Sequence, residues 1–498
     1  MKRAKSLMVL GTGSNVGKSV VAAGFCRILS DWGYRVAPFK AQNMSNNSCV
    51  TEEGGEMGRA QAVQAECARL KPHVDMNPVL LKPAADNSSQ IVLQGRALTN
   101  LSARDYFAQR DRIARIIRES YERLAAAYEI IVLEGAGSPA EVNLKENDLV
   151  NMRMADLADA ACVLVGDIDR GGIFASIIGT LDLLEPGERT RVRGLIVNKF
   201  RGDISLFENG TDFLEKRTGK KIWGVIPYER DLGIEEEDAV HAESAQPASL
   251  SADGLDVAVL LLPRMSNFTD FEVLKYEEGV RLRYLKRPQD FGSPDLLILP
   301  GTKSTMADLA YLEAGGFREK ILDYAAQGGR VLGICGGYQM MGKMLLDPEG
   351  VESDAAEAGG LSFFEMTTRF SPEKILKRVS EEIDCEIFGR RVKGKIEAYE
   401  IHMGRTIHHR VYPALGQFGA VHPSGRLAGT YYHGLFDHAA FRRAFLEALG
   451  KDSGKARPVA GEPLWGDGHK ELHYKRWARH LARSLNLEYL KECLQLSK

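Results

Sequence analysis

The chain has 498 residues, a length that allows two large domains or about three of average size. Hydrophobic residues make up 44% of it and charged residues 27%, which excludes a wholly disordered or fibrous protein. The 65 Lys and Arg residues nearly balance the 67 Asp and Glu residues, so the formal net charge is −2. A protein built to coat nucleic acid carries a basic excess, so no nucleic-acid partner is expected.

Seven cysteines are scattered along the chain, and no two of them form a C-x-x-C pair. Their odd number and wide spacing argue against a disulfide framework and against a thiolate zinc site. The basic N-terminus precedes an apolar run that stops at Gly11, too soon for a signal peptide. No stretch approaches the roughly 18 apolar residues that span a membrane. We therefore expect a cytoplasmic protein with no membrane partner, and the sequence leaves its oligomeric state open.

The first half of the chain alternates short apolar runs with longer segments of helical spacing. The runs predict buried strands at residues 6–10, 35–39, 130–133, 161–165, 195–197 and 223–226. Helical spacing between them predicts helices at 20–30 and 106–128. Continuous apolar strands alternating with helices are typical of a doubly wound parallel sheet that is covered on both faces.

The same alternation starts again after a small, polar stretch. Strands are expected at residues 257–262, 296–299, 330–334 and 428–432, and a helical tail from about residue 441, with a final helix over 471–494. We therefore predict two α/β domains of doubly wound parallel sheets, at residues 1–240 and 254–445. Residues 241–253 are expected to form a linker, and residues 446–498 a helical extension.

A phosphate-binding loop is expected directly after the first strand. The sequence from Gly11 to Ser19 reads GTGSNVGKS and is followed by a helical pattern. Backbone N–H groups of such a loop and the start of the helix surround phosphate oxygens, and a lysine offsets their charge. The residues expected to hold ATP are Gly13, Asn15, Val16, Gly17, Lys18 and Ser19. Ser19 is also placed to bind Mg²⁺.

The spacing of this loop is one residue longer than the common pattern, and it resembles the loop of dethiobiotin synthetase and related amidoligases. Glu134, at the end of the strand in IIVLEGAG, resembles the second magnesium-binding acid of those enzymes. Asn198 in LIVNKF resembles their adenine-binding asparagine, and residues 224–228 (GVIPY) resemble the strand that closes the site. The segment VGDIDRGG adds Asp167 and Asp169 as further candidate acids.

Residues 39–48 (FKAQNMSNNS) follow the second predicted strand and are unusually polar. Burying such groups is costly, so we expect them to face ligand or water, with Lys40, Gln42 and Asn43 as candidate substrate contacts. This segment, together with GGEMGRAQ and MNPVLLKP, resembles the glutamine-dependent cobyric acid synthase family. The resemblance extends over nearly the whole chain.

A nucleophile is expected in the second domain. Cys335 lies between an apolar strand and a predicted helix in VLGICGGYQ, which is the setting of a nucleophile elbow. The positive end of the helix favours the thiolate. His433, in YYHGLFD, follows another strand far along the chain, as in cysteine enzymes that transfer acyl groups.

The pattern around Cys335 resembles that of class I glutamine amidotransferases, which implies further roles. The resemblance assigns oxyanion-hole donors to Gly336 and to Gly301 or Thr302, and a glutamine contact to Gln339. The H-x-E motif of most such enzymes is replaced here by His433-Gly-Leu435. The acid that orients the imidazole is therefore open, and the candidates are Asp437, Glu400 and His402.

The resemblance implies a ligase that uses glutamine, ATP and Mg²⁺. Glutamine would be hydrolysed at Cys335 and His433, and ammonia would amidate an ATP-activated carboxylate. The implied acceptor is adenosylcobyrinic acid a,c-diamide, amidated at its b, d, e and g carboxylates. Alternatives are cobyrinic acid a,c-diamide synthase, another P-loop amidoligase, and a P-loop switch ATPase without ligase chemistry. Switch ATPases usually carry a second lysine early in the loop, where this chain has Gly13 and Ser14, and that alternative gives no role to a Cys–His domain.

Overall fold

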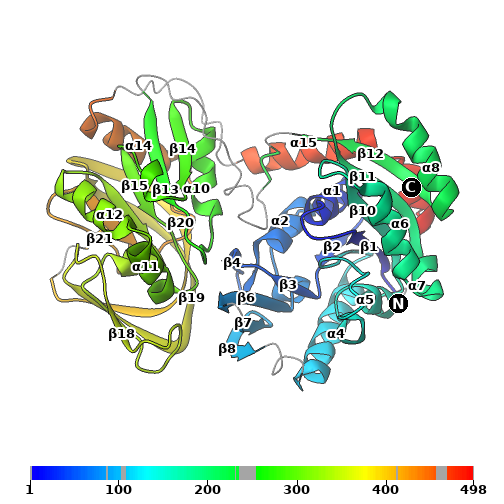
Figure 1. The fold of residues 1–498 in the computed structure, drawn as a ribbon, viewed down its shortest axis with the longest axis horizontal. Coiled ribbons are helices and arrows are strands. Elements are labelled where there is room, and N and C mark those ends of the chain that lie inside the picture. Colours follow the sequence, from blue (N-terminus) through cyan, green and yellow to red (C-terminus); the bar gives the residue numbers. More distant parts are fainter. Residues whose placement is uncertain are drawn as a thin grey trace.

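The computed structural model describes residues 3–85, 88–102, 108–229, 232–234, 254–410, 413–455 and 468–496. The chain forms two lobes (Figure 1). The first lobe comprises the described residues up to 234 together with 468–496, and the second lobe comprises residues 254–455. The expected linker at 241–253 lies outside the described residues.

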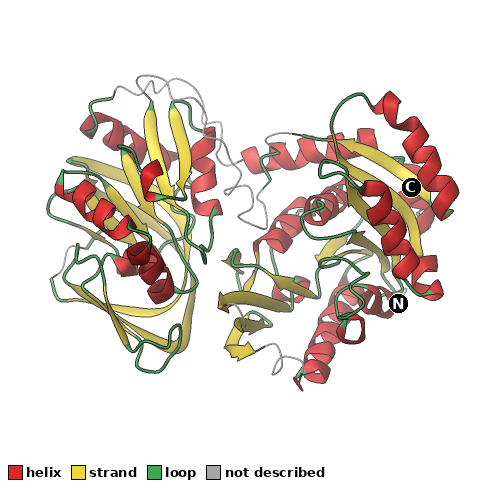
Figure 2. Ribbon diagram, in the orientation of Figure 1, coloured by secondary structure: helices red, strands yellow, loops and turns green. Residues whose placement is uncertain are grey.

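A six-stranded parallel sheet forms the centre of the first lobe. Its strand order is β12-β11-β10-β1-β9-β2. These strands are β1 (Lys5–Gly11), β2 (Val36–Phe39), β9 (Ile130–Glu134), β10 (Ala161–Asp167), β11 (Val192–Phe200) and β12 (Lys221–Pro227). All six strands predicted in this half are confirmed. Their continuous apolar runs bury side chains on both faces of the sheet, because helices cover each face (Figure 2).

Helices follow the strands at nearly every crossover of the first lobe. They are α1 (Lys18–Asp31), α2 (Arg59–Cys67), α4 (Arg110–Ala127), α5 (Met152–Leu157), α6 (Ile173–Leu183), α7 (Pro186–Arg191) and α8 (Glu208–Thr218). In α4, Ile113, Ile117, Tyr121 and Leu124 recur at three- and four-residue intervals and are buried against the sheet. The two helices predicted here are confirmed as α1 and α4 over their described residues.

The first lobe also carries small strands that the sequence did not predict. One sheet has the order β3-β6-β7-β8, and a two-stranded sheet pairs β4 with β5. They are β3 (Gln42–Met44), β4 (Ser48–Val50), β5 (Glu56–Gly58), β6 (Val79–Ala85), β7 (Ser88–Leu93) and β8 (Arg96–Ser102). These strands lie on the side of the first lobe that faces the second lobe (Figure 1).

A second six-stranded sheet, of order β14-β13-β15-β16-β22-β21, forms the centre of the second lobe. All its strands are parallel except the short edge strand β21. The strands are β13 (Leu255–Leu260), β14 (Val280–Leu285), β15 (Leu296–Leu299), β16 (Val331–Ile334), β21 (Ala420–Val421) and β22 (Leu427–Thr430). Its helices are α10 (Thr269–Glu272), α11 (Thr305–Ala314), α12 (Phe317–Ala326), α13 (Gly336–Met340) and α14 (Ala439–Asp452). The predicted fold class, two parallel-sheet α/β units, is confirmed.

A long antiparallel hairpin is the main unpredicted element of the second lobe. Its strands β19 (Met366–Ile387) and β20 (Arg390–His408) pair along most of their length. The short strands β17 (Met344–Leu346) and β18 (Glu357–Gly359) extend this sheet. The hairpin runs beside the contact between the lobes and brings Lys374 to Glu56 of the first lobe.

The C-terminal segment returns to the first lobe as two helices, α15 (His469–Ser484) and α16 (Leu487–Leu494). Trp477 and Leu481 are buried in one core with α1, and Trp477 Nε1 donates to the carbonyl oxygen of Val20 at 2.6 Å. In the described part of the chain, no helix is long and apolar enough to cross a membrane.

Candidate active sites

The loop after β1 has the geometry of a phosphate cradle. Gly17 has φ of 99°, and a Cβ at this position would lie 2.2 Å from Asn198 Nδ2, so only glycine fits. Lys18 is buried, and its Nζ donates to the carbonyl oxygens of Gly13 at 2.7 Å and Gly137 at 3.0 Å. The lysine ammonium is thereby held over the loop, where it can offset the charge of a bound phosphate.

Glu134 is the central acid of this site. It is buried at the carboxyl end of β9, and its Oε1 accepts from Ser19 Oγ at 2.7 Å and from Lys40 Nζ at 2.9 Å. Its Oε2 accepts from Gln64 Nε2 at 2.6 Å and Gln61 Nε2 at 3.3 Å, both on α2. The structure therefore brings the predicted residues Ser19, Lys40 and Glu134 together, and adds two glutamines that the sequence reasoning missed.

The pair Ser19 and Glu134 fits a magnesium ion. Two neighbouring ligands of one octahedral Mg²⁺, each at about 2.1 Å, lie about 3 Å apart. The two oxygens here are 2.7 Å apart. Within the described residues no group of three His, Cys, Asp or Glu side chains could hold a metal, so the other ligands would be phosphates and water.

Asn198 braces the loop from the end of β11. Its Nδ2 donates to the carbonyl oxygen of Val16 at 2.8 Å. The neighbouring Lys199 donates to the carbonyl oxygen of Asn15 at 2.6 Å and to Asp167 Oδ2 at 2.9 Å. Asp167 is therefore near the loop, but it is paired with a lysine.

Asp169 is further from the loop and pairs with Arg201, whose guanidinium lies 3.5 Å from the ring centre of Tyr228. The ion pair joins the loop after β10 to the end of β11, and the stacking of Arg201 on Tyr228 extends this contact to the end of β12. It gives Asp169 a structural contact that needs no metal.

The polar segment 39–48 is mostly buried, which corrects the expectation that its side chains face ligand or water. Asn43 is buried and donates to Gln61 Oε1 at 3.0 Å. Ser48 is buried and donates to Glu56 at 2.8 Å. Gln42 is partly exposed. The cost of burying these groups is offset by hydrogen bonds within the protein, which composition alone does not reveal.

Cys335 occupies a strained turn between β16 and α13. Its φ of 49° and ψ of −109° are unusual for a residue with a side chain, and such strain is typical of a nucleophile elbow. The turn is possible because Gly337 packs directly on β15, where a Cβ would lie 2.0 Å from the Leu299 carbonyl oxygen. The Cys335 thiol is buried, 3.5 Å from the carbonyl oxygen of Ile401.

His433 is held by Asp270, a residue that the sequence reasoning missed. His433 Nδ1 donates to Asp270 Oδ2 at 2.6 Å, and the Gly434 N–H donates to Asp270 Oδ1 at 2.9 Å. Burial by itself lowers the pKa of His433, but the charges of Asp270 and Cys335 outweigh it and raise the pKa to about 10. Within the described residues His433 Nε2 has no hydrogen-bond partner, which leaves it available for proton transfer.

The three residues that the sequence offered for orienting His433, namely Asp437, Glu400 and His402, do not take that role. Glu400 accepts from His402 Nε2 at 3.2 Å, and His402 Nδ1 donates to the Gly404 carbonyl oxygen at 2.7 Å, so these two side chains bond elsewhere. The carboxylate that accepts from His433 Nδ1 belongs to Asp270 rather than to Asp437. Asp270 lies in the segment SNFTD, which follows β13 at the carboxyl edge of the sheet and carries no motif that singles out this residue.

The predicted oxyanion segment lies against the catalytic pair. A Cβ at Gly301 would lie 2.9 Å from His433 Cε1, and one at Gly336 would lie 3.0 Å from the Thr302 backbone nitrogen. The peptide groups of Gly336 and Thr302 are therefore neighbours beside Cys335. Gln339 accepts from Thr305 Oγ1 at 2.9 Å and donates to the Tyr431 hydroxyl at 3.3 Å, which fixes its amide.

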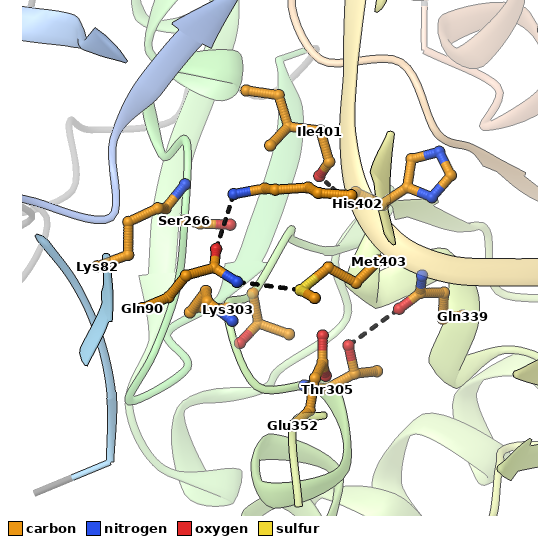
Figure 3. Close-up of a pocket in the computed structure, with 13 residues that line it drawn as sticks. Lys82, Gln90, Ser266, Lys303, Thr305, Gln339, Glu352, Ile401, His402 and Met403 are labelled. Carbon is orange, nitrogen blue, oxygen red and sulfur yellow. Dashed lines mark hydrogen bonds between the residues drawn. The ribbon is translucent and has the colours of Figure 1, made fainter. Parts of the chain in front are cut away.

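A pocket at the contact between the lobes opens onto this site (Figure 3). The lining residues come from both lobes and are Lys82, Gln90, Ser266, Thr302, Lys303, Thr305, Cys335, Gln339, Glu352, Lys374, Ile401, His402 and Met403. Lys82 and Gln90 belong to the small strands of the first lobe. The first lobe thus forms one wall of the pocket that contains Cys335.

Buried charges surround the wall formed by the first lobe. Glu56 accepts from Lys82 at 2.8 Å and from Lys374 at 2.5 Å, and Lys374 also donates to Gln90 at 2.8 Å. Burial lowers the pKa of Lys374 to about 7, although Glu56 partly opposes this shift. Burial also lowers the pKa of Lys303, which lines the same pocket.

Each lobe matches a family model of known proteins. A family model described as "CobQ/CobB/MinD/ParA nucleotide binding domain" matches residues 7–240. One described as "CobB/CobQ-like glutamine amidotransferase domain" matches residues 256–441. A protein named cobyric acid synthase from Syntrophobacter fumaroxidans is 46% identical over 99% of both chains. Another from Pelotomaculum thermopropionicum is 49% identical over 99% of this chain and 97% of its own. This chain belongs to the cobyric acid synthase family.

Membership of the cobyric acid synthase family confirms the resemblance seen in the sequence. The chain is an enzyme, a glutamine-dependent amidoligase with a nucleotide-binding domain and a glutamine amidotransferase domain. Among solved structures, one titled "Structure of PurLQS from Thermotoga maritima" covers 40% of this chain at 16% identity and a TM-score of 0.30. That likeness is too weak to add to the family assignment.

Proposed function

We propose that this enzyme uses ATP and glutamine to convert the b, d, e and g carboxylates of adenosylcobyrinic acid a,c-diamide into amides. The observation that carries the proposal is the pairing of a phosphate loop and Glu134 in one lobe with Cys335, His433 and Asp270 in the other. The name of the relatives, cobyric acid synthase, supports the corrinoid acceptor. The seven cysteines are all free, which fits a reducing cytoplasm.

Glutamine hydrolysis is assigned to the second lobe. The Cys335 thiolate attacks the side-chain amide carbon of glutamine, and the carbonyl electron pair moves onto oxygen. The neighbouring N–H groups of Gly336 and Thr302 stabilise that oxyanion. When it collapses, His433 gives a proton to the leaving nitrogen, which departs as ammonia. Water, deprotonated by His433, then hydrolyses the glutamyl thioester to glutamate.

Carboxylate activation is assigned to the first lobe. A carboxylate oxygen of the acceptor attacks the γ-phosphorus of ATP, giving an acyl phosphate and ADP. Ammonia then attacks the acyl carbon, and phosphate leaves. Lys18 and Lys40 offset the phosphate charge, and Asn198 is proposed to contact adenine. A magnesium ion held by Ser19 and Glu134 would further neutralise the phosphates. Gln42, which is partly exposed beside Lys40, is the proposed acceptor contact.

The pocket between the lobes is the proposed path of ammonia. Ammonia that escapes into neutral water takes up a proton and can no longer attack the acyl phosphate. The pocket contains Cys335 and is walled by Lys82 and Lys374.

Mass spectrometry of the products tests the proposed acceptor. The enzyme is incubated with ATP and glutamine and with either cobyrinic acid or its adenosylated a,c-diamide. We expect four successive amidations of the a,c-diamide and no reaction of cobyrinic acid at its a and c carboxylates. Amidation of those two positions, with none at b, d, e or g, would instead assign the enzyme to the a,c-diamide synthases.

A further inference from the structure

Two buried asparagines join the lobes next to the acid that orients His433. Asn47 Oδ1 accepts from the backbone N–H of Phe268 at 3.1 Å, and Asn267 Oδ1 accepts from the backbone N–H of Ser48 at 3.0 Å. Asn47 is 3% exposed and Asn267 is 2% exposed. We call this reciprocal pair the Asn47–Asn267 clamp. Because each side chain bonds the backbone of the opposite lobe, the clamp fixes the two segments against each other.

In the second lobe, the clamp is connected to His433 through hydrogen bonds of Asp270. Asn267 has φ of 52°, and its carbonyl oxygen accepts from the Asp270 N–H at 3.0 Å. The Asp270 carboxylate in turn holds His433 Nδ1 and the Gly434 N–H. A displacement of the turn that contains Asn267 therefore moves the carboxylate that sets the position of His433.

On the side of the first lobe, the clamp leads to the proposed magnesium-binding acid. The carbonyl oxygen of Asn47 accepts from the N–H of Arg59 at 3.1 Å, the first residue of α2. Gln61 and Gln64, in the following turn of α2, donate to Glu134. Glu134 and His433 are thus joined by an unbroken series of short contacts through α2, the clamp and Asp270.

We propose that Asn47 is a positioning residue for glutamine hydrolysis, which makes the geometry of Asp270 and His433 depend on the nucleotide site of the first lobe. This inference rests on the proposed function. Ser19 and Glu134 would hold the metal of bound MgATP, so loading of the site would alter the contacts that Glu134 makes with Gln61 and Gln64 of α2. A movement of α2 shifts Asn47, and the hydrogen bonds of the clamp transmit this shift to the turn that contains Asn267 and Asp270. Glutamine is then hydrolysed fast only when the ligase site is loaded, so ammonia is not released without an acceptor.

The test compares two activities of the full-length enzyme. Glutaminase activity is measured as glutamate formed, with and without ATP and the corrinoid, and ligase activity is measured with ammonium chloride. The variants are Asn47→Ala, which removes one bond of the clamp, and Asn267→Gly, which removes the other and tolerates the positive φ. Asn46→Ala is the matched control in the same segment, since Asn46 Oδ1 has no hydrogen-bond partner in the described part of the chain.

In the wild type we expect ATP and corrinoid together to stimulate glutaminase activity. In Asn47→Ala and Asn267→Gly this stimulation should fall by about fivefold to tenfold, the effect of one buried hydrogen bond. Their ammonia-dependent rates should stay within about twofold of wild type, as should the stimulation of Asn46→Ala. Asn47→Asp, which keeps an acceptor for Phe268, should recover part of the stimulation.

Three results would overturn the inference. The first is a wild-type glutaminase activity that ATP and corrinoid do not change, and the second is undiminished stimulation in the clamp variants. The third is a double variant of Asn47 and Asn267 whose loss of stimulation equals the sum of the two single losses in free energy. If Asn47→Ala loses both activities through misfolding, Asn267→Gly decides, because it leaves the side chains of the first lobe unchanged. A wild-type enzyme that makes no amide even from ammonia would instead contradict the proposed function.

Discussion

At the scale of single residues, the contact between Asp270 and His433 is the main electrostatic feature of the proposed glutaminase site. Asp270 is 3% exposed, so its charge acts on the imidazole through little intervening water. The resulting rise in the pKa of His433 keeps the imidazole protonated beside Cys335. The imidazolium can then serve as the acid that expels ammonia.

Removing the charge of Asp270 should therefore move the pH profile of glutamine hydrolysis. In Asp270→Asn the pKa of His433 falls, because the anion that raises it is gone and burial still lowers it. The imidazolium is then lost at a lower pH, so the alkaline limb of kcat should shift to lower pH. The rate at the optimum should fall about a hundredfold. The measurement is glutamate formation against pH.

Asp437→Asn serves as the comparison for Asp270→Asn. Asp437 was a candidate from the sequence, but the carboxylate that bonds His433 Nδ1 is that of Asp270. Its variant should keep the wild-type alkaline limb and most of its rate. An unshifted profile in Asp270→Asn, or an equal shift in both variants, would contradict the role given to Asp270.

Lys18 is the corresponding residue in the nucleotide site. Lys18→Ala should lower amide formation by at least about a hundredfold with either glutamine or ammonia, because the phosphate charge is no longer offset. Lys216→Ala, which removes an exposed lysine of the same lobe, should leave both rates unchanged. Amide formation is measured in parallel with the two nitrogen sources. Normal product from Lys18→Ala would refute the phosphate site.

Whether a residue of the two sites could be predicted depends on whether a short sequence motif marks it. Lys18 and Cys335 were predictable because a strand, a turn and a helix follow one another within a few positions. Asp270 was not, because it meets His433 across 163 residues and belongs to a short helix with no motif of its own. Gln61 and Gln64 were missed for the same reason, since only the fold brings α2 to Glu134.

At the scale of elements, strands with buried runs were predictable and exposed ones were not. β16 is buried along its whole length and β1 from Ser6 onward, so their sequences are dominated by apolar residues. Most side chains of the β19–β20 hairpin are exposed or partly exposed, and many of them are charged. Such a sequence cannot be distinguished from that of a loop. The small strands β4 and β5 are held by buried hydrogen bonds rather than by an apolar pattern.

The C-terminal helix α15 should contribute to the stability of the first lobe. Trp477 is 3% exposed in the core that α15 shares with α1, so Trp477→Ala should lower the free energy of unfolding by about 3–5 kcal/mol. Leu472→Ala on the same helix is the control, because Leu472 is 60% exposed. Urea unfolding of the intact chain measures both variants. Equal effects of the two substitutions would contradict this packing.

At the scale of the whole molecule, the proposed mechanism assigns one part of the reaction to each lobe. The pocket that contains Cys335 has a wall from each lobe, and the buried charges of Glu56, Lys82 and Lys374 lie across the same contact. The sequence predicted two domains but not their contact, because the contact is made of polar side chains from unpredicted strands. The family relationship explains why both lobes occur in one chain.

The central claim is that Cys335 serves only to release ammonia, while the first lobe activates the carboxylate. It is tested most directly by amide formation in Cys335→Ala with glutamine and with ammonium chloride at high pH. Cys385→Ala is the control, since Cys385 lies on β19 and is also in the second lobe. The variant should make no amide from glutamine and keep the ammonia-dependent rate within about twofold of wild type. A Cys335→Ala enzyme that still used glutamine at the wild-type rate would contradict the account.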